Sequence, residues 1–84
     1  MKIEIVTEKE QLGRVLIANL PHAATIINGK GVYSGKERFV IKMVVSSYEV
    51  NHAVKVIENA DPAAFVEVTE LKAVYGRFFL PPIK

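Results

Sequence analysis

The segment Arg38–Val45 constrains the fold more than any other part of the sequence. Phe39, Ile41, Met43 and Val45 fall on one side of an extended chain, whereas Arg38, Lys42 and the two intervening valines fall on the other. This alternation predicts a strand with apolar residues on both sides. We therefore expect one side to face helices, and the other to face solvent, a ligand or, as the valines favour, another subunit.

The remaining patterns predict five more elements. Thr7 with Glu10, and Ser46 with Glu49, have the spacing of a capping box, in which a hydroxyl and a later carboxylate cap a helix start. Pro21 is expected to end the first helix, and Gly13 within it costs on the order of 1 kcal/mol relative to alanine. The predicted order is strand Lys2–Val6, a helix carrying Leu12 to Leu20, strand Ala24–Ile27, strand Arg38–Val45, a helix from Val50 to about Asn59, and strand Ala64–Thr69.

This order, β-α-β-β-α-β, predicts an α+β fold of the ferredoxin-like type over a single domain, residues 1–84. Its compact form is a four-stranded antiparallel sheet with two helices on one face. The apolar tail 71–84 is expected to pack on the sheet edge or on a neighbouring subunit. A short extra C-terminal strand is a further expectation, although prolines limit it.

Length and composition favour self-association. A chain of 84 residues buries only about 60% of its unfolded surface, and without cysteine it has no disulfide to compensate. Half of its residues are apolar, so we expect a homo-oligomer, either a trimer or a dimer. The net charge of +2 is too small to indicate nucleic-acid binding. The sequence has neither a membrane-spanning run nor a signal peptide, which favours a cytoplasmic location.

The glycine-rich segment 28–38 is the main candidate for ligand binding. Glycines can present backbone N–H groups to an anion, and basic side chains add charge. However, the segment matches neither a Walker loop nor a dinucleotide-binding fingerprint, so a mobile hairpin with solvated lysines remains an alternative. The candidate ligand-binding residues are Asn28, Gly29, Lys30, Gly31, Tyr33, Ser34, Gly35, Lys36 and Arg38.

No catalytic or metal-binding set emerges. His22 follows a helix-ending proline and His52 lies off the apolar stripe of its helix, so both are expected at the surface rather than on a metal. Ser34 has no histidine nearby in the sequence to act as a base. An RNA-recognition platform requires aromatic residues on two central strands, and the first strand has only aliphatic ones. We therefore expect a protein that is not an enzyme.

Three motifs occur in order along the chain, namely Thr25–Glu37 (TIINGKGVYSGKE), Val44–Glu49 (VVSSYE) and Asp61–Val66 (DPAAFV). Together they resemble the C-terminal cytoplasmic domain of YitT-type bacterial membrane proteins. The resemblance covers roughly Ile3 to Gly76. The ending Gly76-Arg77-Phe78-Phe79 departs from the usual glycine-rich ending of the family. Many members carry membrane helices before this domain, so we expect the present sequence to be either a stand-alone version or a domain excised from a longer protein.

The fold of this family resembles that of PII-like signalling proteins, which commonly trimerise and bind nucleotides between subunits. The resemblance implies a ligand-sensing module that binds a small anion, with a nucleotide as the candidate, and that is associated with a membrane protein. This transfer rests on fold-level analogy. The alternative is a purely structural oligomerisation domain of a bacterial membrane protein. No cofactor is certain.

Overall fold

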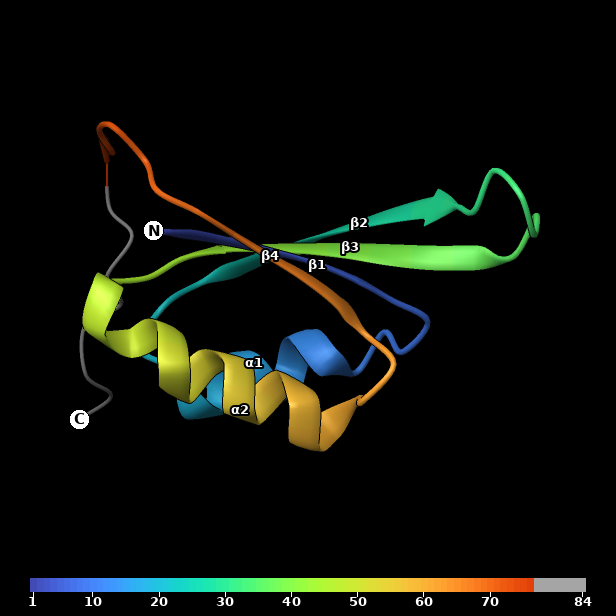
Figure 1. Cartoon of the computed structure of the whole chain (residues 1–84), viewed down its shortest axis with the longest axis horizontal. Coiled ribbons are helices and arrows are strands. Elements are labelled where there is room, and N and C mark those ends of the chain that lie inside the picture. Colours follow the sequence, from blue (N-terminus) through green and yellow to red (C-terminus); the bar gives the residue numbers. More distant parts are fainter. Residues whose placement is uncertain (77–84) are drawn as a thin grey trace.

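A computed structural model describes residues 1–76 and has the predicted ferredoxin-like arrangement (Figure 1). The sheet has the strand order β2-β3-β1-β4, and every neighbouring pair is antiparallel. Both helices lie on the same side of the sheet. The elements are β1 (Lys2–Thr7), α1 (Leu12–Asn19), β2 (Ala24–Lys30), β3 (Glu37–Val44), the short 3₁₀ helix η1 (Ser47–Glu49), α2 (Val50–Ala60) and β4 (Phe65–Thr69).

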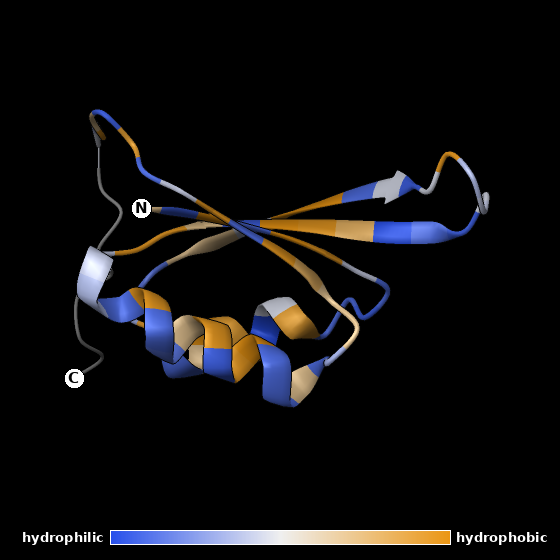
Figure 2. Ribbon diagram, in the orientation of Figure 1, coloured by the Kyte–Doolittle hydropathy of each residue, from blue (hydrophilic) through white to orange (hydrophobic). Residues whose placement is uncertain are grey.

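The core lies between the sheet and the helices. Alternate residues of the two central strands point into it, and their register places Ile3 opposite Met43 and Ile5 opposite Ile41. Figure 2 shows this apolar middle of the sheet, which becomes hydrophilic towards the β2–β3 hairpin. The buried cluster comprises Ile3, Ile5, Leu12, Leu16, Leu20, Ile41, Met43, Val45, Ala53 and Ile57. The predicted inward side of β3 is therefore confirmed.

The expected capping box at Thr7 is wrong. Thr7 is buried as the last residue of β1, and α1 begins only at Leu12 with Gln11 as its N-cap. The Thr7 hydroxyl donates to Asp61 Oδ2 at 2.5 Å and accepts from the Lys9 N–H at 3.0 Å. The hydrogen bond between the Thr7 hydroxyl and Asp61 therefore links the end of β1 to the turn that follows α2.

The second capping box is confirmed. Ser46 is the N-cap of η1, and the Glu49 carboxylate accepts a hydrogen bond of 2.7 Å from the Ser46 N–H. Helix α2 continues directly from η1 and buries Ala53 and Ile57. A carboxylate at a helix start accepts a hydrogen bond from an N–H group that lacks a partner within the helix. Its negative charge also interacts favourably with the positive end of the helix dipole.

Strand β2 extends farther than the sequence predicted. The expected strand stopped at Ile27, but β2 continues to Lys30 because Asn28, Gly29 and Lys30 pair in register with β3. Residues 70–76, which follow β4, form neither helix nor strand. The remainder of the tail 71–84, and with it most of the extra strand expected there, lies outside the described residues.

Candidate functional site

The structure distributes the nine candidate ligand-binding residues along the β2–β3 hairpin. Asn28, Gly29 and Lys30 end β2, and Arg38 is the second residue of β3, so only the segment 31–36 forms the connecting loop. Figure 1 shows that this hairpin projects beyond the two helices. Register places Asn28 on the helix side of the sheet with buried Phe39, and Gly29 on the opposite side with Arg38.

The loop is held by its own hydrogen bonds. The Gly31 N–H donates to the Lys36 carbonyl at 2.8 Å, and the Gly35 N–H donates to the Gly31 carbonyl at 2.9 Å. Gly35 has φ +73, a left-handed conformation that favours glycine. These two glycine N–H groups are thus used to close the turn, and any ligand contact by the loop falls mainly on side chains and on the N–H groups at its tip.

The loop side chains are open to solvent. Val32 and Tyr33 are 103% and 104% exposed, respectively. Lys30 directly precedes the loop and Lys36 is its last residue, and in the part of the chain that the structure describes neither forms an ion pair. An exposed cation without a partner is available to an anion, since no existing contact has to be broken first.

Arg38 differs from the two lysines because it already has a carboxylate partner. Its Nη1 lies 3.0 Å from Glu8 Oε2, so β3 is linked to the residue that follows β1. Arg38 lines a groove of about 470 Å³ that also contains Lys9, Asp61 and Phe65. Both basic and acidic residues line this groove, which lies at the base of the hairpin.

The larger groove, of about 700 Å³, lies on the helix side between α1 and the hairpin. Arg14, Ile17, Ile26 and Phe39 line it, and Asn28 is the only one of the nine candidates among its lining residues. Neither of these two grooves includes Lys30 or Lys36. Within residues 1–76, neither of these two grooves therefore gathers the candidate residues.

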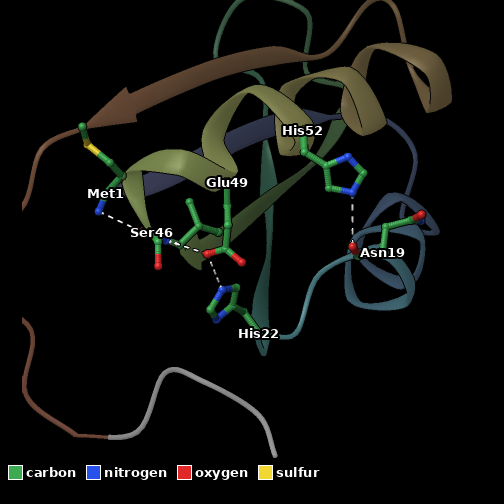
Figure 3. Close-up of polar contacts among 7 residues, drawn as sticks. Met1, Asn19, His22, Ser46, Glu49 and His52 are labelled. Atoms are coloured by element: carbon green, nitrogen blue, oxygen red, sulfur yellow. Dashed lines mark hydrogen bonds and ion pairs between the residues drawn. The ribbon is translucent and has the colours of Figure 1, made fainter. Parts of the chain in front are cut away.

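A buried polar cluster was missed by the sequence analysis (Figure 3). His22, expected at the surface, is fully buried, and its Nε2 donates to Glu49 Oε1 at 2.8 Å. Burial alone would raise the pKa of Glu49, but the hydrogen bonds from Ser46 and His22 hold this pKa below its ordinary value. The capping box marked Glu49 in the sequence, but its tertiary partner lies 27 residues away. His52 is exposed, as expected, and contacts the Asn19 carbonyl at 3.3 Å.

Asp61 forms a second buried polar contact. The Thr7 hydroxyl lowers the pKa of Asp61, as do the Ala63 N–H and the charge of Lys9, although burial opposes them. Its two oxygens accept from Thr7 and from the Ala63 N–H, so the carboxylate is satisfied by the fold. Among residues 1–76, no group of three or more His, Asp or Glu side chains is placed to hold a metal ion. No helix in this range is long and apolar enough to cross a membrane.

Two known proteins with similar sequences are membrane proteins. The chain is 28% identical over 79 residues to the UPF0750 membrane protein YxkD of Bacillus subtilis (strain 168), covering 93% of this chain and 28% of that protein. It is 23% identical over 75 residues to the UPF0750 membrane protein YitT of the same organism, covering 88% and 27%, respectively. The chain thus spans less than a third of the length of these relatives. The expected resemblance to YitT-type proteins is confirmed.

Two solved structures share the fold. A functionally unknown protein from Pediococcus pentosaceus ATCC 25745 has a TM-score of 0.74 at 19% identity, covering 92% of this chain and 94% of that one. An uncharacterized conserved bacterial protein from Eubacterium ventriosum, assigned to DUF2179, has a TM-score of 0.65 at 23% identity, covering 81% and 94%. The family model described as "Uncharacterized protein conserved in bacteria (DUF2179)" matches residues 22–76, and this chain therefore belongs to the DUF2179 family.

Proposed function

We propose that this chain is a non-enzymatic sensing module that binds a small anionic ligand at the β2–β3 hairpin, with a nucleotide as the leading candidate. The observation that carries the proposal is the pair of exposed lysines, Lys30 and Lys36, which lie at the two ends of the loop without ion-pair partners in the described chain. Tyr33 between them offers an aromatic ring on which a base can stack.

The proposal places the complete site at a contact between subunits. The hairpin residues lie on two sides of the sheet, and neither groove of one subunit includes the two lysines. A second subunit beside the hairpin supplies the missing wall. Binding then orders the projecting loop and changes its contact with a partner. Because the named relatives are membrane proteins, this partner is a membrane protein, with the module on the cytoplasmic side.

Titration calorimetry with ATP, ADP, AMP and cyclic dinucleotides tests this function. We expect at least one nucleotide to bind the wild type, and the double variant Lys30→Ala/Lys36→Ala to bind it at least about tenfold more weakly, since two charge-assisted contacts are lost. The matched control is Lys55→Ala, which removes an exposed lysine from α2 and is expected to bind like the wild type. Equally flat titrations for all three proteins contradict the proposal.

The alternative, a structural oligomerisation module of a membrane protein, is favoured by a different observation. The side of the sheet opposite the helices carries the exposed apolar side chains Ile27 and Phe65. This surface supports self-association whether or not a ligand binds.

A further inference from the structure

The sheet face opposite the helices, here called the open face, is not covered by any element of residues 1–76 (Figure 1). Its middle is an apolar row that crosses all four strands. Register places Ile27 beside Val40, Val40 beside Val6, and Val6 beside Phe65. Ile27 and Phe65, at the two ends of the row, are 46% and 63% exposed, respectively. A continuous apolar row of this kind is typical of a surface that packs against another protein surface.

Charged residues flank this row on both sides, and next to the row their signs differ between the strands. On one side, Lys42 of β3 lies 3.8 Å from Glu4 of β1. On the other side, Arg38 of β3 pairs with Glu8, which follows β1. Strand β4 adds the acidic residue Glu67 beside Glu4. Next to the apolar row, the β2–β3 half of the open face is therefore basic and the β1–β4 half is acidic.

We infer that a second copy of this chain covers the open face, packed face to face about a two-fold axis that runs parallel to the strands between β1 and β3. This rotation places the β2–β3 half of one copy over the β1–β4 half of the other, and each row of residues stays at the same level along the strands. The apolar rows then meet, with Val40 over Val6 of the second copy and Ile27 over its Phe65. Sheets stacked in this way pack about 10 Å apart with an angle of about −30° between their strands.

The charges select this axis over the other way of stacking the same faces. With the axis parallel to the strands, Lys42 lies over Glu4 of the second copy and Arg38 lies over its Glu8, so both of these cations gain an additional anion. With the axis perpendicular to the strands, β3 lies over β3, and Lys42 faces Arg38 of the second copy. Opposing like charges cost energy across an interface, which disfavours the perpendicular axis.

The area of the open face gives an estimate of the affinity of the dimer. Four strands about 4.8 Å apart and about six residues of about 3.3 Å each give a footprint of about 400 Å² per subunit. This is about half of the roughly 800 Å² per partner that stable complexes bury, so we expect a dissociation constant between about 10 μM and 1 mM. The dimer is a separate inference from the proposed function and does not depend on ligand binding.

Sedimentation equilibrium from about 10 μM to 1 mM, without nucleotide, tests the inference. We expect the wild type to dimerise and Lys42→Glu to weaken the dimer at least about tenfold, because the isologous contact carries the substitution twice. The double variant Glu4→Lys/Lys42→Glu restores opposite charges and is expected to recover the dimer. Lys55→Glu on α2 is the matched control, and it is expected to dimerise like the wild type.

Three results overturn the inference. A stronger dimer for Lys42→Glu indicates the perpendicular axis, and no recovery in the double variant indicates that these charges do not meet. A wild type that stays monomeric at about 1 mM shows that no second copy covers the open face. If Phe65→Asp then also lowers the melting temperature of the monomer, a segment of the same chain covers this face. Because nucleotide binding is measured separately by calorimetry, failure of the dimer is distinguishable from failure of the proposed function.

Discussion

The two polar regions at opposite ends of the sheet differ in how their charged groups are used. At the start of α2, His22 is fully buried and bonds to Glu49, which is half-buried and also accepts from the Ser46 N–H. At the β2–β3 hairpin, Lys30 and Lys36 are exposed and have no ion-pair partner in the described chain. The comparison indicates that the first region holds the fold together, whereas the second is free to contact a ligand. Substitutions in the first should therefore change stability, and substitutions in the second should change binding.

The largest effect is expected for Glu49→Ala. This change leaves buried His22 without its carboxylate and removes the cap from the Ser46 N–H, so we expect a loss of about 2–4 kcal/mol in the free energy of unfolding. Chemical denaturation measures it. Lys36→Ala, the matched change at the hairpin, is expected to stay within about 0.5 kcal/mol of the wild type. Equal losses for the two variants contradict the comparison.

A pronounced loss of stability in acid is expected next. The pKa values of Glu49 and Asp61 are lowered by folding, so the folded chain binds these protons less tightly than the unfolded chain. Their contribution is present above the ordinary values of 4.5 and 3.8 and is lost as the pH falls through the lower folded values. Denaturation curves at several pH values below about 5 measure this loss.

The variant Asp61→Asn sharpens the acid experiment. It removes one of the two carboxylates, so its stability should fall less steeply as the pH decreases. Glu58→Gln, an exposed position on α2, provides the control and should keep the wild-type slope. An unchanged slope for Asp61→Asn would show that this buried carboxylate does not contribute to the pH dependence.

A smaller effect is expected at the hairpin itself. Gly35→Ala adds a side chain to a residue with φ +73, where the strain costs roughly 1 kcal/mol although the surrounding space is open. Thermal denaturation measures the loss. Because the strain is confined to the loop, the far-ultraviolet circular dichroism spectrum should not change. A stabilised Gly35→Ala would show that the loop does not require the left-handed conformation.

The smallest effect is a gain in stability. A methyl group added to Gly13 in α1 meets only Ile41 Cδ1, at an ordinary contact distance of 3.9 Å. Alanine therefore fits, and Gly13→Ala should raise the free energy of unfolding by about 0.5–1 kcal/mol through helix propensity. Denaturation at neutral pH checks this value. A destabilised variant would indicate that the α1–β3 contact has no room for the methyl group.

The main features of the fold could be predicted because they depend on local patterns. The two-sided alternation of β3 and the cap at Ser46 each involve residues close together in the sequence. Two of the errors involve distant partners. The local pattern does not indicate that Thr7 bonds to Asp61, which is 54 residues away, or that His22 bonds to Glu49, which is 27 residues away.

The candidate site shows the same division. The glycine composition correctly indicated a turn between β2 and β3, but it could not show that Asn28, Gly29 and Lys30 continue β2, because this depends on pairing with β3. Nor could it show that the Gly31 and Gly35 N–H groups close the loop on itself. Which groups remain free for a ligand is decided by these hydrogen bonds, and composition does not reveal them.

The most direct test of the central claim is a map of amide chemical shifts recorded by nuclear magnetic resonance during titration with the nucleotide that binds most tightly. We expect the largest shift changes within residues 28–38, and little change at His22, Ser46 and Glu49. Changes absent from the hairpin and concentrated on α1, along the larger groove, would contradict the assignment of ligand binding to the β2–β3 hairpin.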